Sequence, residues 1–310
     1  MNKKVIKSYK AFDKDMKCRD FQYEVGKEYE MDGHIECCTR GFHACESPLE
    51  VFDHYDMLNS RFAEVEQSGT IDREEGSTKV CSSRIKIKEE LKLADIINIG
   101  VEWLKDITSP SNVKADGALN DKGDRKEQIG SSGDYANIGS SGGSAKIGSS
   151  GDYAKIGSSG YSAQIGSSGG YAKIGSSGDH AKIGSSGGYV KIGSSGYYAK
   201  IGSSGGYAKI GSSGYSAKIG SSGYSAQIGS SGGCAKIDST GEDSVIMCAG
   251  NNSKAKAKIG SWITLAEWKW SNEKNRYVPV CVKTEYVDGE KIKADTWYKL
   301  ENGKFVEVNE

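Results

Sequence analysis

From position 129 onward, hydrophobic and polar residues recur with a period of nine. Twelve copies of Ile-Gly-Ser-Ser-Gly-x-Tyr/Ser-Ala-Lys follow one another without insertion between Ile129 and Lys236. Within each copy, Ala and Ile alternate with Tyr and Lys, which predicts a short strand with Ala and Ile inside and Tyr and Lys outside. The Ser-Ser-Gly that follows is typical of a turn, because glycine accepts a positive φ. Self-similarity at a fixed short period predicts a β-solenoid.

The seventh position of the repeat indicates how the copies pair into coils. It is tyrosine in nearly every odd-numbered copy and mixed in the even-numbered copies. A strict nine-residue period does not produce this segregation, whereas an 18-residue coil made of two copies does. We therefore expect a two-sided solenoid of about six coils with one ladder of tyrosines on a face. The ladder comprises Tyr135, Tyr153, Tyr171, Tyr189 and Tyr207.

Residues 1–107 have the pattern of a small α+β domain. The motif Ser47-Pro48-Leu49-Glu50 predicts a helix that begins with a capping box. Alternating segments predict strands and amphipathic segments predict helices. The expected strands are 5–12, 21–31, 41–45, 61–72 and 78–88, and the expected helices are 48–55 and 93–107.

Residues 254–310 are β-rich and aromatic, and we expect them to form a small antiparallel cap on the last coil. A cap is needed because the end of a solenoid is an open sheet edge. Hairpins are predicted at Asp288-Gly289 and at Glu301–Gly303. The remaining boundaries are a linker with a degenerate first repeat at 108–128 and the solenoid itself at 129–253.

Composition and cysteine usage restrict the class of protein. Among the 310 residues, Lys+Arg and Asp+Glu both number 41, which excludes a wholly basic nucleic-acid-binding chain. The start has no apolar export segment, and no 18-residue apolar stretch occurs, so we expect no membrane association. The eight cysteines are irregularly spaced, which favours reduced thiols in a cytoplasm.

Three motifs resemble those of an uncharacterised family encoded by phages and prophages of Gram-positive bacteria. They are Tyr-Lys-Ala-Phe-Asp-Lys-Asp at 9–15, Gly-Phe-His-Ala-Cys-Glu-Ser-Pro-Leu at 41–49 and Asp-Thr-Trp-Tyr-Lys-Leu at 295–300. Members of that family carry nonapeptide Gly/Ser/Ala repeats behind an N-terminal domain of unknown function. The resemblance implies a viral or mobile-element setting in the host cell cytoplasm, and it implies no particular chemistry.

Lysine fills most ninth positions of the repeat. These lysines make the outer surface of the solenoid a candidate binding site. The 108 repeat residues hold nine Lys and three Asp, a net charge of +6. Lys could contact phosphates and Tyr could stack on bases, or Lys could simply keep the outer strands soluble. The candidate lysines are Lys155, Lys173, Lys182, Lys191, Lys200, Lys209 and Lys218.

Two further candidates lie in the N-terminal domain. His34, Cys37, Cys38, His43 and Cys45 fall within twelve residues, but they lack the Cys-x-x-Cys spacing of a zinc knuckle, so we expect core thiols and no metal. The segment Gly41–Glu46 loosely resembles a strand of ADP-ribosyltransferases, which implies a nucleotide site at His43 and Glu46. Calcium is not expected, because Asp never forms a column along the repeat.

The sequence contains no established catalytic motif, so the leading hypothesis is a binding protein without enzymatic activity or cofactor. In this hypothesis the solenoid is a rigid surface for a host protein or a nucleic acid, and counter-defence against the host is its setting. One alternative is a nucleotide-handling N-terminal domain with the solenoid as a spacer. Another is a structural rod that assembles with itself, for which the Tyr ladder could be a homodimer seam.

Overall fold

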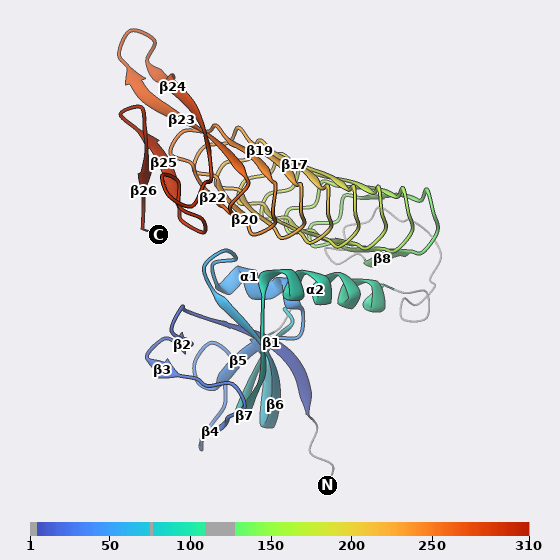
Figure 1. The fold of residues 1–310 in the computed structure, drawn as a ribbon. Coiled ribbons are helices and arrows are strands. Elements are labelled where there is room, and N and C mark those ends of the chain that lie inside the picture. The colour runs from blue at the N-terminus through green and yellow to red at the C-terminus, as the bar shows by residue number, and fades with distance from the viewer. Residues whose placement is uncertain (1–4, 75–76, 109–127, 310) are drawn as a thin grey trace. The chain divides into compact units, whose positions relative to one another are not determined.

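The computed structural model describes residues 5–74, 77–108 and 128–309. Figure 1 shows a β-rich N-terminal part, a solenoid and a C-terminal pair of hairpins. The chain divides into two compact units, one ending at Trp103 and the other beginning at Leu104. The predicted linker and the degenerate first repeat at 108–128 fall almost wholly outside the described residues. The prediction of a two-sided β-solenoid with an N-terminal domain and a C-terminal β region is confirmed.

The N-terminal unit is built on a five-stranded sheet of order β4-β7-β5-β1-β6. Strands β6 and β7 also pair with each other, so β7, β5, β1 and β6 form a closed ring around a buried core. The sheet strands are β1 (Ile6–Phe12), β4 (Glu28–Glu30), β5 (Phe42–Cys45), β6 (Arg61–Arg73) and β7 (Lys79–Leu91). The other elements are β2 (Lys17–Cys18), β3 (Phe21–Gln22), η1 (Pro48–Glu50), α1 (Val51–His54) and α2 (Leu93–Ile107), of which α2 runs across the boundary between the two units.

Two local predictions in this unit hold only in part. The strand expected at 21–31 is interrupted at Gly26, whose φ of 86° marks a turn between β3 and β4. The helix expected at 48–55 is a 3-10 turn followed by only four α-helical residues. Ser47 makes no N-cap hydrogen bond, and the Glu50 carboxylate instead accepts from the backbone N–H and the hydroxyl of Thr78. A tertiary contact therefore replaces the local capping box.

The solenoid coils alternate between two parallel sheets, which we call the β8 sheet and the β9 sheet after their first strands. Residues 18 apart stack in register, for example Ile156 on Ile174, which confirms the 18-residue coil. The β8 sheet contains β8 (Gln128–Ser131), β10 (Lys146–Ser149), β12 (Gln164–Ser167), β14 (Lys182–Ser185), β16 (Lys200–Ser203), β18 (Lys218–Ser221), β20 (Lys236–Ser239) and β22 (Lys254–Ala257). The β9 sheet contains β9 (Asn137–Ser140), β11 (Lys155–Ser158), β13 (Lys173–Ser176), β15 (Lys191–Ser194), β17 (Lys209–Ser212), β19 (Gln227–Ser230), β21 (Val245–Cys248), β23 (Trp262–Ser271) and β24 (Arg276–Tyr286).

The solenoid is longer than the repeat consensus predicts. Parallel pairing continues beyond Lys236 through β22 and up to Leu265, giving about eight turns where six were expected. The last coils keep the interior alternation, with Ile246, Cys248 and Ile263 fully buried, although their outer residues no longer match the consensus. The inward pattern therefore carries the fold further than the visible repeat does.

In the turn, or corner, between two strands, the fifth and seventh residues of the repeat have different roles from those predicted. The fifth-position glycine does not have a positive φ; instead, a Cβ there would lie about 2 Å from a carbonyl oxygen one coil away, as at Gly187 against Gly169. Positive φ falls on the seventh position, for example 56° at Tyr171 and 59° at Tyr189. The glycine is thus required for close approach of coils, and the left-handed residue is a tyrosine, serine, histidine or cysteine.

Two antiparallel C-terminal hairpins extend the solenoid sheets, so the expected antiparallel cap forms as a continuation of these sheets. Strand β24 continues the β9 sheet, and β25 (Tyr298–Glu301) with β26 (Lys304–Glu307) continues the β8 sheet. The first hairpin turns at 272–275, so the hairpin predicted at Asp288-Gly289 was wrong. Buried residues between the hairpins, including Val287 and Ile292, close the end of the solenoid core. Neither helix in the described ranges has the length and apolar character needed to cross a bilayer.

Candidate functional site

The outward face of the β9 sheet carries a regular array of lysine side chains beside glycines, where the backbone is exposed. Alternation along strand β11 places Lys155 and Gly157 on the same side, and both are exposed. The face repeats with the coil, so lysines and glycines form parallel columns. We call it the lysine–glycine face; it consists of Lys155, Lys173, Lys191 and Lys209 with Gly139, Gly157, Gly175, Gly193 and Gly211.

The glycine column leaves a shallow groove whose volume is about 830 Å³ along β9 to β15. A Cβ added at Gly157, Gly175 or Gly193 would meet no atom within 4 Å. Packing therefore does not require glycine here, in contrast to the fifth position of the repeat. A glycine inside a strand often marks a place where a ligand or another backbone comes close.

The lysines beside this groove lack partners within the part of the chain that the structure describes. Lys155, Lys173, Lys191 and Lys209 form no ion pair with a described residue. Successive strands of a sheet lie about 4.8 Å apart, so the four cations are stacked closely. Their mutual repulsion would be relieved by an anionic partner, which is the usual electrostatic logic of a basic stripe.

The tyrosine ladder lies in the turns that lead into the strands of the lysine–glycine face, two residues before each strand begins. Successive rings from Tyr135 to Tyr207 stack with centroids 4.7–5.0 Å apart and planes 6–13° from parallel. The inner rings of this ladder have both faces covered by neighbouring rings. They therefore offer edges and hydroxyl groups to a partner, and no free ring face on which a base could stack.

The structure divides the predicted lysine column between the two sheets. Lys155, Lys173, Lys191 and Lys209 belong to the β9 sheet, together with the ladder. Lys182, Lys200 and Lys218 begin strands of the β8 sheet. The candidate binding residues thus do not form one surface.

Beyond the repeat, the same face of the β9 sheet becomes apolar. Val245 and Met247 on β21 lie in register with β23, and Trp262 on β23 packs against Tyr286 on β24 at 5.0 Å between ring centroids. The exposed fractions of these side chains are 43–55%. Val282, 59% exposed, lies opposite Ala266 on the same side. We call these five residues, Val245, Met247, Trp262, Val282 and Tyr286, the apolar end of the face.

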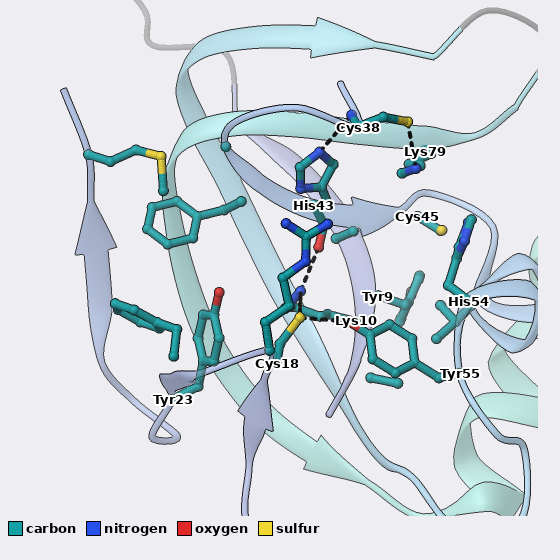
Figure 2. A pocket seen from close by; sticks show the side chains of 18 of the residues that line it. Tyr9, Lys10, Cys18, Tyr23, Cys38, His43, Cys45, His54, Tyr55 and Lys79 are labelled. Atoms are coloured by element: carbon teal, nitrogen blue, oxygen red, sulfur yellow. Dashed lines mark hydrogen bonds between the residues drawn. The ribbon is translucent and has the colours of Figure 1, made fainter. Parts of the chain in front are cut away.

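The N-terminal unit contains a separate cavity of about 730 Å³, shown in Figure 2. Lys10 on β1 lies in its wall and is 3% exposed. Its ammonium donates to the carbonyl of His43 at 2.9 Å and contacts Sγ of Cys18 at 3.4 Å. The rings of Phe12, Tyr23 and Tyr55 lie 5.4–5.9 Å from this nitrogen. Burial lowers the pKa of Lys10.

Other charged groups of the cavity are mainly cationic. Among the described residues that line it, Arg19 and Lys79 are cationic and Asp20 is the one acid. Cys18 Sγ and the Tyr55 hydroxyl lie 2.8 Å apart, and burial raises the pKa of that tyrosine. A cavity of this size with a few convergent polar groups matches a small-molecule pocket.

The two residues predicted as a nucleotide site do not share this cavity. His43 on β5 lines it, while Glu46 lies outside and forms an ion pair with Arg73. His43 Nε2 accepts the backbone N–H of Cys38 at 3.0 Å. Burial and then the nearby Lys10 and Lys79 lower the pKa of His43 to about 4, so the ring is neutral at physiological pH.

The structure also rearranges the Cys/His cluster seen in the sequence. Cys37 and His43 are joined by Cys81, and their ligand atoms all lie within 4.8 Å of one another. Cys38 is exposed and its thiol contacts Lys79 at 3.1 Å, while His34 and Cys45 take no part in the group. No local spacing could reveal Cys81, which the pairing of β5 with β7 brings into place.

Together these features define a β-solenoid protein with a separate pocket-bearing N-terminal domain. Residues 6–99 match a family described as a domain of unknown function, DUF7666. This match agrees with the unknown N-terminal domain expected from the resemblance, and its description does not bear on phage origin or on the repeats. No curated protein and no solved structure matches the chain.

Proposed function

We propose that this chain is a binding protein whose lysine–glycine face docks an acidic surface of another protein. The observation that carries the proposal is the continuity of one exposed face. Four lysines without ion pairs to described residues run along an open glycine groove and lead into the apolar end of the same sheet. Positive charge would orient the partner, and the aromatic and aliphatic side chains would anchor it.

A protein partner fits this face better than a nucleic acid does. Stacking on bases needs free ring faces, which the inner tyrosines of the ladder lack. Arginine, the residue best suited to bidentate phosphate contacts, is absent from the repeat. An exposed cluster of Met, Val, Trp and Tyr is typical of protein interfaces.

The resemblance to phage-encoded proteins supports an infected host cell as the setting of this proposed binding. A rigid rod that binds and blocks a host protein in the host cytoplasm would act in counter-defence. The nine-residue repeat suits this task, because a repeat array presents an extended surface without a large core.

The test compares three forms of the full chain as bait in a nuclease-treated lysate of a Gram-positive host. The first is wild type, the second has Lys155, Lys173, Lys191 and Lys209 changed to Gln, and the third has Lys182, Lys200, Lys218 and Lys236 changed to Gln. The two variants lose the same charge, so they separate position from net charge. We expect a protein that wild type and the β8-sheet variant retain and that the β9-sheet variant loses.

Equal retention by the two variants, or no retained protein at all, would refute the proposal. Material that is retained only before nuclease treatment would favour a nucleic acid as the partner. Far-UV circular dichroism of all three baits checks that the solenoid is intact.

A second candidate function is favoured by the cavity around Lys10. Lys10, Arg19 and Lys79 surround a space of about 730 Å³, which suits a small anionic molecule such as a nucleotide. In this function the solenoid is a spacer. Thermal-shift titration with NAD⁺ and ATP tests it, and Arg19→Gln should reduce the shift; no shift with wild type would count against it.

A further inference from the structure

Three side chains of types that commonly ligate metals, two cysteines and one histidine, meet beside strand β5. His43 on β5 lies directly opposite Cys81 on β7 in the antiparallel register, so the two side chains share one side of the sheet. Cys37 comes from the preceding turn and completes the group, with all three ligand atoms within 4.8 Å of one another. None of the three is fully exposed.

The turn that carries Cys37 is held in place by several bonds. The backbone N–H of Arg40 donates to the carbonyl of Glu36 at 2.9 Å, and the N–H of Cys37 donates to Asp72 at 2.7 Å. Gly41 then brings the chain close to Cys81, because a Cβ there would lie 2.0 Å from its Sγ. This approach, with a φ of 137°, requires glycine and sets the thiol beneath the turn.

His43 brings an unprotonated ring nitrogen to the group, and this nitrogen is already a hydrogen-bond acceptor. Nε2 accepts the N–H of Cys38 at 3.0 Å, so this nitrogen carries the lone pair. Nδ1 is then the protonated nitrogen, and a metal ion at Nε2 has to displace the Cys38 N–H bond. Ligating histidines usually donate their second ring N–H to a carbonyl or carboxylate, and Nδ1–H is the group that would do so here.

We propose that Cys37, Cys81 and Nε2 of His43 bind one thiophilic divalent cation, for which Zn²⁺ is the best match. Two thiolates and one imidazole select zinc over magnesium, calcium or manganese. Tetrahedral coordination with normal Zn–S and Zn–N bonds places ligand atoms about 3.3–3.8 Å apart, so the side chains need to close by on the order of 1 Å. Two thiolates balance the charge of the dication, and the fourth position is left for water or an exchangeable ligand.

The test is metal titration of the full-length reduced protein after treatment with a chelator and its removal. We expect one equivalent of Zn²⁺ per chain, and Co²⁺ should produce a thiolate-to-cobalt charge-transfer band with visible bands of four-coordinate geometry. Cys37→Ser and His43→Gln should weaken Co²⁺ binding by more than the roughly 10–100-fold that loss of a supporting residue costs. Cys37 is half-buried, so its replacement tests binding even if a Cys81 variant fails to fold.

Cys38→Ser is the matched control, because it removes the adjacent thiol, which contacts Lys79 rather than the cluster. It should bind Co²⁺ as wild type does. The proposal is overturned if Cys37→Ser and His43→Gln bind like wild type or if Co²⁺ produces no charge-transfer band. It is also overturned if Cys37 and Cys81 form a disulfide whose reduction leaves a protein that binds no metal.

Discussion

Replacing a single fifth-position glycine should disrupt the solenoid, whereas replacing a groove glycine should not. In Gly187→Ala, the new Cβ would lie 2.1 Å from the carbonyl oxygen of Gly169 and 2.6 Å from its carbon. Real Cβ contacts essentially never fall below 3.0 Å, so the coils must separate by about 0.9 Å at this corner. Gly193→Ala is the matched control, because its Cβ would meet nothing within 4 Å.

The expected cost follows from the hydrogen bonds that join the coils. Across this junction, Ser186 N–H donates to the Ser167 carbonyl at 3.0 Å and Tyr171 N–H donates to the Gly188 carbonyl at 2.9 Å, so a separation of about 0.9 Å breaks both. Each lost bond costs about 1 kcal/mol, and the steric strain adds about 1–3 kcal/mol. We expect Gly187→Ala to lower the free energy of unfolding by about 3–5 kcal/mol. Gly193→Ala should raise it by about 0.5–1 kcal/mol, because alanine loses less backbone entropy on folding.

The assay is urea unfolding of the full chain followed by circular dichroism, with hydrogen exchange on peptides from the central coils. Exchange should quicken around the Gly187→Ala corner and stay slow in Gly193→Ala. Equal stability of the two variants would refute the argument that coil contact, rather than turn conformation, requires glycine at the fifth position.

Three further predictions concern single side chains. Burial raises the pKa of Asp238 to about 6, so its contribution to stability is present below pH 4 and is lost as the pH rises to about 6. In urea unfolding above pH 6, Asp238→Asn should therefore have a free energy of unfolding about 1–3 kcal/mol higher than wild type, even though it loses the ion pair with Lys256. Near pH 4 the two proteins should be equally stable. A difference that stays constant between pH 4 and pH 6 would contradict the raised pKa of Asp238. At Tyr171, with a φ of 56°, Asn should be tolerated better than Val by about 1–2 kcal/mol in thermal unfolding, and the reverse order would be evidence against a left-handed corner. In metal-free native protein at pH 7, maleimide should label the exposed Cys38 and spare the buried Cys81, whose pKa burial raises to about 12; labelling of both at one rate, read by mass spectrometry, would disprove this burial.

The solenoid could be predicted because the same nine-residue pattern repeats twelve times without an insertion. Alternation of Ala and Ile fixed the interior, and segregation of tyrosine between odd and even copies fixed the coil length. The same coil length implies that successive lysines alternate between sheets, so Lys182 and Lys191 had to lie on different faces. The lysine column therefore divides between the two sheets, although its nine-residue spacing looks uniform in the sequence.

The N-terminal sites could not be predicted in the same way. Lys10, Cys18 and Tyr55 meet in one cavity through strand pairing, and no local spacing records that contact. Cys81 reaches His43 for the same reason. The role of the fifth-position glycine was also hidden, because the sequence shows a turn residue but not the carbonyl that lies one coil away.

The central claim, that the lysine–glycine face is the docking surface, is tested most directly by a lysine footprint. The captured partner would be added to the full chain, surface amines would be acetylated, and the modified lysines would be identified by mass spectrometry. We predict that Lys155, Lys173, Lys191 and Lys209 lose reactivity when the partner binds, while Lys274 in the first C-terminal hairpin turn keeps it. Unchanged acetylation of all four lysines in the complex would contradict the claim.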